Sequence, residues 1–394
     1  MGAHFTHDFS FDPAYGHTLD DLRRVGVPAA PGDFDAFWRS RYEAALRVDP
    51  APETGRLEEE RDGVRIFAVT YTSVGGVRIG GRLVLPAEGP VEHGFVIGHG
   101  YGGRDAAGPD VPLPLPRSAA LLPCVRGMGD RSLLPGIPAT ADGHVLYGIG
   151  SRDTYVIGDC VADLWCAASA LLALVPELDR RGGPGSGLVS RLGPGPGPGP
   201  GFVPGPGPAP GPGPGPGPGP GSGLGPGPGS DPGPGPGPAP DPGLGPVAGP
   251  RLGYLGESFG GGLGALALPW DARFAAGQLT VPTFGNHPLR LTLPCVGSGE
   301  SVRTYHRSHP EVTDVLRYFD AATAATRIRV PVLVAAARFD PSVPPPGQFA
   351  VVNGLAEKGE LRVLSAGHFE HPGTEAEARE LTLAKQEFFA RQAV

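Results

Sequence analysis

Between residues 182 and 250 the chain consists almost entirely of glycine and proline, mostly in strict alternation. Collagen needs glycine at every third position, so the period of two in this tract excludes a triple helix. Proline interrupts helices and sheet ladders, and a tract with so few apolar side chains cannot build a core. We therefore expect a disordered, partly polyproline-like insert at 182–250, and one folded domain assembled from residues 1–181 and 251–394.

Outside this tract, short apolar runs alternate with segments of helical periodicity. Strands are predicted at 94–98, 118–125, 251–255, 329–337 and 361–364, with a hairpin over 67–85. Helices are predicted at 33–46, 154–178, 261–268, 349–355 and 376–390, and 274–317 is expected to be loop-rich with short helices. Strands that alternate with helices indicate an α/β fold, with a mostly parallel sheet covered by helices on both faces.

A candidate nucleophile stands where the predicted strand 251–255 passes into the predicted helix 261–268. Residues 256–260 read Gly-Glu-Ser-Phe-Gly and fit the Gly-x-Ser-x-Gly pattern of a nucleophile elbow, with Ser258 at its centre. Such an elbow is a cramped turn, so its flanking residues must be small, and the hydroxyl is exposed beside a helix N-terminus. The five residues alone would also fit an ordinary glycine-rich turn, so partners elsewhere in the chain must decide.

A serine nucleophile needs a base within hydrogen-bond reach, and the base needs a group that fixes its tautomer. Asp340 and His368 follow Ser258 along the chain, and each stands just after a predicted strand. Ser, Asp, His is the chain order of the triad in α/β-hydrolases. His371 is the competing candidate for the base, and a turn aspartate and a surface histidine are the alternatives to catalytic roles.

Attack on a carbonyl also needs two backbone N–H groups directed at the developing negative charge. Phe259, the residue after the serine, is the expected first donor. The loop from His99 to Gly103, His-Gly-Tyr-Gly-Gly, ends an apolar strand and makes Tyr101 the expected second donor. No Gly-Lys-Ser/Thr follows this loop, so it is not predicted to hold a phosphate. Chemistry of this kind requires no metal and no cofactor.

Together with flanking motifs, these residues resemble the acetyl xylan esterase and cephalosporin-C deacetylase family of α/β-hydrolases, over roughly 18–180 and 250–390. The motifs are Asp33-Phe-Asp-Ala-Phe-Trp38, His99-Gly-Tyr101, Arg126-Gly127, Gly148-Ile-Gly-Ser-Arg-Asp-Thr-Tyr155, Gly256-Glu-Ser-Phe-Gly-Gly261, Tyr318-Phe-Asp320, Phe339-Asp340 and Gly367-His368. The resemblance implies an α/β-hydrolase fold, a triad of Ser258, Asp340 and His368, and an oxyanion hole formed by Tyr101 and Phe259. It also implies a preference for small acyl groups and a compact homo-oligomer.

Three features depart from the family pattern. Met128 and Phe259 stand where the family usually has glutamine, and His368-Phe369-Glu370 contains one residue more than the family's His-Glu. Because an oxyanion hole needs only the backbone N–H of Phe259, the chemistry is expected to survive. The shape of the pocket and the position of His368 are where these departures are expected to act.

Composition limits the kinds of molecule that the protein is expected to bind. A net charge of −8 without a basic cluster argues against nucleic acid and anionic membranes. No signal peptide and no segment able to span a bilayer are predicted, so a cytoplasmic protein with a small acetylated substrate is expected. The leading hypothesis is a serine esterase that deacetylates acetylated sugars (acetyl xylan, xylo-oligosaccharides) or cephalosporin C. The alternatives are a broader carboxylesterase or peptidase of the same fold, and an impaired hydrolase acting as an interaction scaffold.

Overall fold

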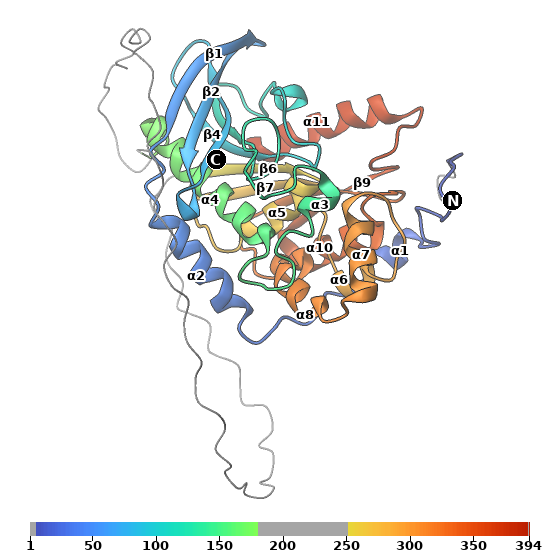
Figure 1. Cartoon of the computed structure of the whole chain (residues 1–394). Helices are drawn as coiled ribbons and strands as arrows, with labels where there is room; N and C mark the ends of the chain where they lie inside the picture. The colour runs from blue at the N-terminus through green and yellow to red at the C-terminus, as the bar shows by residue number, and fades with distance from the viewer. Residues whose placement is uncertain (1–4, 180–250, 393) are drawn as a thin grey trace, which may run out of the picture. The chain divides into compact units, whose positions relative to one another are not determined.

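Residues from both sides of the glycine-proline tract contribute strands to one sheet. The computed structural model describes residues 5–179, 251–392 and 394, so the insert predicted at 182–250 lies outside the described residues (Figure 1). Within the described residues the sheet has the order β1-β2-β3-β5-β4-β6-β7-β8-β9. Its strands are β1 (Glu53–Arg61), β2 (Val64–Thr72), β3 (Arg78–Pro86), β4 (His93–Gly98), β5 (Ser118–Pro123), β6 (Leu252–Glu257), β7 (Phe274–Thr280), β8 (Val332–Ala337) and β9 (Gly359–Leu364).

The sheet is antiparallel at one end and parallel through the rest. β1, β2, β3 and β5 pair antiparallel in that order, and every later pair from β5 to β9 is parallel. β2 and β3 form the hairpin predicted over 67–85. The first strand after the tract, β6, lies beside β4, with Gly98 opposite Gly256. The carboxyl ends of the parallel strands therefore meet at one edge of the sheet, where ligands bind in open α/β folds.

Helices cover both faces of the sheet, as the sequence pattern predicted. They are α1 (Leu19–Leu22), α2 (Phe34–Leu46), α3 (Ala141–His144), α4 (Val156–Leu174), α5 (Phe259–Ala267), α6 (His287–Arg290), α7 (Ser298–Ser308), α8 (Val312–Leu316), α9 (Ala321–Ala325), α10 (Pro345–Leu355) and α11 (Thr374–Ala390). α4 and α5 lie on one face and α11 on the other (Figure 1). Successive strand residues point to opposite faces, so Val96 packs in the α4 and α5 core while Phe95 packs against Phe389 of α11.

Two strands were not predicted from the sequence. β1 carries six charged residues among nine and is largely exposed, so only its pairing with the hairpin strand β2 makes it a strand. The prediction for 274–317 was wrong at its start, because β7 is a completely buried strand with the sequence Phe-Ala-Ala-Gly-Gln-Leu-Thr. Such a strand is buried on both faces and shows no alternation, and alanine, glycine and glutamine do not favour strands by themselves.

The expectation that no segment could span a bilayer needs correction for α4. In the described part of the chain this one helix is long and apolar enough to cross a membrane, with a mean hydropathy of 1.6 over its best window. Most of that window, 78%, is buried inside the fold. α4 packs against α2, α5 and the strands β4 and β5. These contacts are those of a central core helix, which passes the same test of length and composition.

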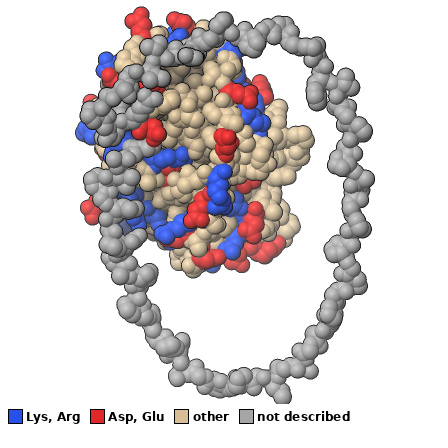
Figure 2. Space-filling view, turned by 90° about the vertical axis from the view of Figure 1, so that its left-hand side faces the viewer, with Lys and Arg blue, Asp and Glu red and all other residues tan. Residues whose placement is uncertain are grey.

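On the face of the molecule shown in Figure 2, acidic and basic side chains are intermixed among uncharged ones. Among the described residues, ion pairs between exposed side chains include Arg24 with Asp21 and Arg362 with Glu380. Exposed pairs of this kind contribute little to stability.

Candidate active site

Ser258 occupies a strained turn between β6 and α5. Its backbone has φ 52° and ψ −108°, a conformation that costs free energy for any residue except glycine. The turn is held from both sides, because Ser258 N–H donates to Thr280 O at 2.8 Å and Thr283 N–H donates to Ser258 O at 3.1 Å. Strain that the surroundings enforce in this way exposes the hydroxyl at the carboxyl edge of the sheet, as the elbow pattern predicted.

The glycines on either side of the serine are required by close backbone contacts. A Cβ at Gly256 would lie 2.4 Å from Gly260 O, and a Cβ at Gly260 would lie 2.7 Å from the carbonyl carbon of Gly98. Real Cβ atoms do not approach backbone atoms so closely, so neither position accepts a side chain without rearrangement. The tight turn therefore explains why the pattern needs glycine at these two positions.

The structure brings Ser258, His368 and Asp340 together from three different strand ends. Ser258 Oγ lies 2.9 Å from His368 Nε2, and His368 Nδ1 lies 2.9 Å from Asp340 Oδ2. Asp340 follows β8 and His368 follows β9. With Nδ1 donating its proton to the carboxylate, Nε2 is left as the acceptor for the serine hydroxyl, which is the arrangement that general-base catalysis needs.

Asp340 is completely buried, and its carboxylate is fully hydrogen-bonded. Oδ1 accepts from the backbone N–H groups of Ser342 and Val343, both at 2.9 Å, and Oδ2 accepts from Gln348 Nε2 at 2.9 Å. Gln348 is held in turn, because its Nε2 also donates to Val343 O and its Oε1 accepts from Ala337 N–H. The sequence analysis did not identify Gln348, whose side chain reaches Asp340 from α10 only once the chain is folded.

The environment of His368 raises its pKa above the ordinary value. Burial lowers the pKa, but the charge of Asp340 and the hydrogen bond to it outweigh that effect, with a smaller contribution from Glu257. His368 also has a positive φ of 46°, which the residues Gly367 and Phe369 on either side do not share. The loop that contains the additional residue therefore still directs the imidazole at Ser258.

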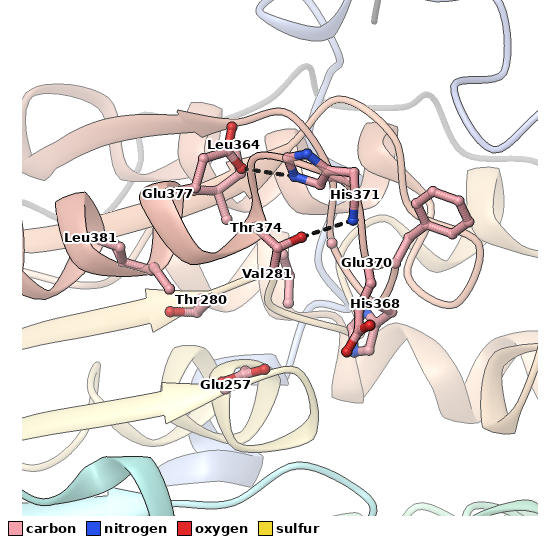
Figure 3. Close-up of a pocket in the computed structure, with 14 residues that line it drawn as sticks. Glu257, Thr280, Val281, Leu364, His368, Glu370, His371, Thr374, Glu377 and Leu381 are labelled. Carbon is pink, nitrogen blue, oxygen red and sulfur yellow. Dashed lines mark hydrogen bonds and ion pairs between the residues drawn. The ribbon is translucent and has the colours of Figure 1, made fainter. Parts of the chain in front are cut away.

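His371, the competing candidate, lies in a different environment. Its Nε2 forms an ion pair with Glu377 at 3.4 Å, and its backbone N–H donates to Thr374 Oγ1 at 2.8 Å. Both partners belong to α11. His371 and His368 border the same cavity of about 390 Å³, which also adjoins Glu257 (Figure 3). Ser258 does not line this cavity, so the cavity adjoins His368 but not the nucleophile.

The predicted oxyanion donors lie side by side next to the serine. A Cβ at Gly100 would be 3.9 Å from Ser258 Cβ, so the loop after β4 passes directly by the nucleophile. The rings of Tyr101 and Phe259 are stacked, with centroids 3.9 Å apart and planes 15° apart. In the described part of the chain neither backbone N–H has a hydrogen-bond acceptor. Phe259 is the first residue of α5, where N–H groups have no partner within the helix.

His99 braces the loop that carries Tyr101. Its Nε2 accepts from Val125 N–H at 3.1 Å, so Nδ1 carries the proton and donates to Gly100 O at 2.7 Å. Burial lowers the pKa of His99 to about 4, so the ring is neutral at physiological pH. The neutral imidazole of His99 is hydrogen-bonded through both of its nitrogens, and it holds the loop beside Ser258. His99 takes no part in proton transfer.

A serine on a strand-to-helix elbow, within a mostly parallel sheet that helices cover on both faces, is the arrangement of the α/β-hydrolases. The family model for acetyl xylan esterase (AXE1) matches this chain at residues 17–181 and 245–386. The match covers more than half of the sequence, and the chain therefore belongs to the acetyl xylan esterase family. The resemblance stated from the sequence motifs is confirmed.

Solved structures show the same fold. Acetyl xylan esterase 1 from Thermoanaerobacterium sp. JW/SL YS485 is 19% identical, with a TM-score of 0.65 over 95% of this chain and 99% of that one. The acetyl xylan esterase from Paenibacillus sp. R4 is 20% identical, with a TM-score of 0.64 over 93% of this chain and 99% of that one. The predicted α/β-hydrolase fold class is thus confirmed.

Metal-ligating residues do not gather anywhere in the described part of the chain. There, no group of three or more histidine, cysteine, aspartate or glutamate side chains is placed to hold a metal ion. The four cysteines, Cys124, Cys160, Cys166 and Cys295, are all buried and free.

Proposed function

We propose that this chain, a carboxylic ester hydrolase of the acetyl xylan esterase family, removes acetyl groups from acetylated sugars through an acetyl-enzyme on Ser258. The observation that carries the proposal is the continuous hydrogen-bonded chain from Ser258 Oγ through His368 to Asp340. A serine in hydrogen-bond contact with a neutral imidazole, which a buried carboxylate orients, is an activated nucleophile.

The proposed reaction has two half-reactions. Ser258 Oγ attacks the acetyl carbonyl carbon while His368 Nε2 takes the hydroxyl proton, and the resulting oxyanion accepts from Tyr101 and Phe259 N–H. The intermediate collapses, the bond to the sugar oxygen breaks, and His368 returns the proton to that oxygen. A water molecule then attacks the acetyl-enzyme with His368 again as base, which releases acetate and restores Ser258.

The aromatic pair beside the nucleophile supports a small acyl group. Phe259 is completely buried and is packed between Tyr101 and Phe284, whose ring centroids lie 3.9 Å and 6.0 Å from it. The ring stands where the family usually has a polar glutamine, and it stacks on Tyr101, the residue expected to supply the second oxyanion donor. We infer that acetyl esters are cleaved faster than butyryl and longer esters.

Cephalosporin C is a narrower form of the same proposal. Its acetyl ester, like that of an acetylated sugar, releases a primary or secondary alcohol on hydrolysis. We also propose a cytoplasmic location, on the basis of the composition. A homo-oligomeric state is proposed on the basis of the family resemblance.

Acetate release from acetylated xylo-oligosaccharides, with 4-nitrophenyl acetate, butyrate and octanoate as an acyl series, tests the function. The expected result is turnover of the oligosaccharides and a maximum of kcat/KM at the acetyl ester. A maximum at butyrate or beyond would favour a broader carboxylesterase, and turnover of peptide substrates alone would favour a peptidase. No turnover of any ester by folded protein would leave the interaction scaffold as the better hypothesis.

A further inference from the structure

A segment rich in aromatic residues, at positions 5–15, lies against the loops that carry the triad. Residues 5–11 alternate aromatic and polar side chains, in the order Phe-Thr-His-Asp-Phe-Ser-Phe. The aromatic side chains are partly buried, whereas Thr6, Asp8 and Ser10 between them are exposed. Residues 5–15 form neither a helix nor a strand. We call this segment, which turns one aromatic face to the protein, the N-terminal strap.

The strap packs on two phenylalanines that adjoin the triad. Phe339 directly precedes Asp340 in the sequence. Phe369 directly follows His368, and its ring centroid lies 5.0 Å from that of Phe339. The ring of Phe5 contacts both, with centroids 5.0 Å from Phe339 and 5.6 Å from Phe369. One residue of the strap thus joins the two segments that carry the carboxylate and the base of the triad.

Two more rings of the strap extend this cluster. The ring centroid of Phe9 lies 6.2 Å from that of Phe369, and the centroid of His7 lies 5.4 Å from that of Phe339. Only 3% of Phe339 is exposed, so its ring is almost completely covered. Aromatic rings at such separations attract one another beyond the burial of their surface. The strap therefore holds Phe339 and Phe369 with two rings against each.

Hydrogen bonds fix the other end of the strap. Asp340 N–H donates to Pro13 O at 3.1 Å, and Asp340 is completely buried. A buried N–H group that loses its acceptor is costly, so this bond ties the strap to the backbone of the triad carboxylate. The hydroxyl of Tyr15 donates to Pro294 O at 2.6 Å. The strap is thus held by rings at one end and by hydrogen bonds at the other.

The backbone of His368 needs support of this kind. Its φ of 46° is strained for a residue other than glycine, and such a conformation persists only where the surroundings enforce it. On one side, Gly367 N–H donates to Phe339 O at 2.8 Å, and a Cβ at Gly367 would lie 2.5 Å from Asp340 Oδ2. On the other side stands Phe369, the residue by which this loop exceeds the family pattern. The rings of the strap hold that residue.

We propose that the N-terminal strap positions the imidazole of His368, with Phe5 and Phe9 as positioning residues that act through Phe369. The inference rests on the proposed esterase function and adds residues 5–15 to the structure that supports its triad. Displacement of a reacting group by about 1 Å can cost about 100-fold in rate. A catalytic histidine in a strained loop therefore depends on the residues that pack against its neighbour.

A double variant of the strap tests this proposal in the full chain. Phe5→Ala/Phe9→Ala should lower kcat on 4-nitrophenyl acetate at least tenfold and change KM less than threefold, because the substrate still binds while the base is misplaced. Phe5→Leu/Phe9→Leu, which keeps apolar side chains of similar size, should stay within threefold of the wild type. Phe67→Ala, the same change at a partly buried position of β2, should leave kcat within twofold. Denaturant unfolding shows that each variant is folded under the assay conditions.

Three results would overturn the positioning role. One is a folded double variant with wild-type kcat, which would show that the strap only adds stability. The second is an equal loss of kcat in Phe67→Ala, and the third is a rise in KM at unchanged kcat.

A single substitution covers the case in which the double variant does not fold. Phe9→Ala removes one ring from Phe369 and should slow phosphorylation of Ser258 by diethyl 4-nitrophenyl phosphate at least threefold. An unchanged rate would contradict the proposal. This rate also separates the two proposals: a wild type that is labelled but cleaves no acetyl ester would remove the proposed function and leave the strap testable. A wild type that is neither labelled nor active would contradict both, because no activated serine would exist.

Discussion

The two sides of Ser258 differ in how their polar atoms are satisfied. On the histidine side, both oxygens of Asp340 and both nitrogens of His368 have partners, and Gln348 is itself held at both ends of its amide. On the tyrosine side, the hydroxyls of Tyr101 and Tyr155 have no partner among the described residues. The two sides also differ in exposure, because the two tyrosine hydroxyls are completely enclosed whereas about 25% of the His368 side chain is exposed.

This contrast separates the groups of the triad, which act on one another, from buried hydroxyls outside it. A triad works only if its geometry exists before substrate arrives, so its hydrogen bonds are complete within the protein. A buried hydroxyl without a partner instead costs about 1–3 kcal/mol of stability.

The largest loss of activity is expected when the nucleophile is removed. Ser258→Ala should reduce kcat on 4-nitrophenyl acetate by about 10⁴-fold or more, because no acyl-enzyme can form. Folding should be unchanged, since the alanine removes one exposed hydroxyl. Steady-state kinetics measures the effect, with Ser308→Ala on α7 as the control. Activity within tenfold of the wild type in Ser258→Ala would exclude this serine as the nucleophile.

The next test separates the two histidines of the C-terminal loop. His368→Ala should lose about 10³-fold or more in kcat, because the general base is gone. His371→Ala should retain most activity and lose only the ion pair with Glu377, whose contribution is about 1 kcal/mol or less. The same kinetic assay applies to both variants. An active His368→Ala beside an inactive His371→Ala would reverse the assignment.

Gln348 tests whether the complete hydrogen bonding of Asp340 matters. Gln348→Leu should lower kcat roughly tenfold to a hundredfold and the free energy of unfolding by about 1–3 kcal/mol, because the donor to Asp340 and two backbone partners are lost. Denaturant unfolding and kinetics measure the two effects. A variant with unchanged kcat would show that the backbone N–H groups of Ser342 and Val343 suffice to hold the carboxylate.

The pH dependence of kcat/KM also tests the histidine side of the site. Only neutral His368 accepts the serine proton, so kcat/KM should rise as pH increases through the pKa of this histidine in the free enzyme. The carboxylate of Asp340 raises that pKa, so the midpoint should lie above the ordinary value of about 6.5. Asp340→Asn should move the midpoint of any residual activity downward. A profile that is flat from pH 5 to pH 8 would contradict a histidine base.

The smallest expected effect concerns the glycine-proline tract, which the sequence predicts to be a disordered insert. The described chain reaches it after α4 and resumes at β6, whose amino end lies opposite the carboxyl edge that carries Ser258. Replacement of residues 183–249 by a four-residue turn should leave kcat/KM within a few-fold. The free energy of unfolding should stay the same or rise by about 2 kcal/mol, since a shorter loop costs less entropy.

A folded but slow variant would contradict this prediction. If the shortened protein unfolds at the same denaturant concentration as the wild type yet loses a hundredfold in kcat/KM, the tract contributes to the active site.

The elbow and its partners were predictable because their signals are local. Gly256 and Gly260 flank the serine because backbone contacts forbid side chains there, and Asp340 and His368 each follow an apolar run that forms a strand. Gln348 carries no such signal. A glutamine eight residues after Asp340 becomes notable only when α10 places it beside the site.

The missed strand β7 shows the same limit in the fold. Its small side chains fit the limited space between neighbouring strands and helices. For example, a Cβ at Gly277 would lie 2.7 Å from Leu268 Cδ1. Close packing of this kind is a tertiary property, and it overrides the low strand propensity of glycine and alanine.

Covalent labelling tests the central claim, that Ser258 is a nucleophile activated by His368, most directly. The wild type, Ser258→Ala and His371→Ala would be treated with diethyl 4-nitrophenyl phosphate, and the labelled peptides mapped by mass spectrometry. We predict one diethylphosphoryl group per chain on Ser258 in the wild type and in His371→Ala, with loss of activity in proportion to labelling, and no label in Ser258→Ala. A label on another residue that accounts for the loss of activity, or full activity after stoichiometric labelling of Ser258, would contradict the account.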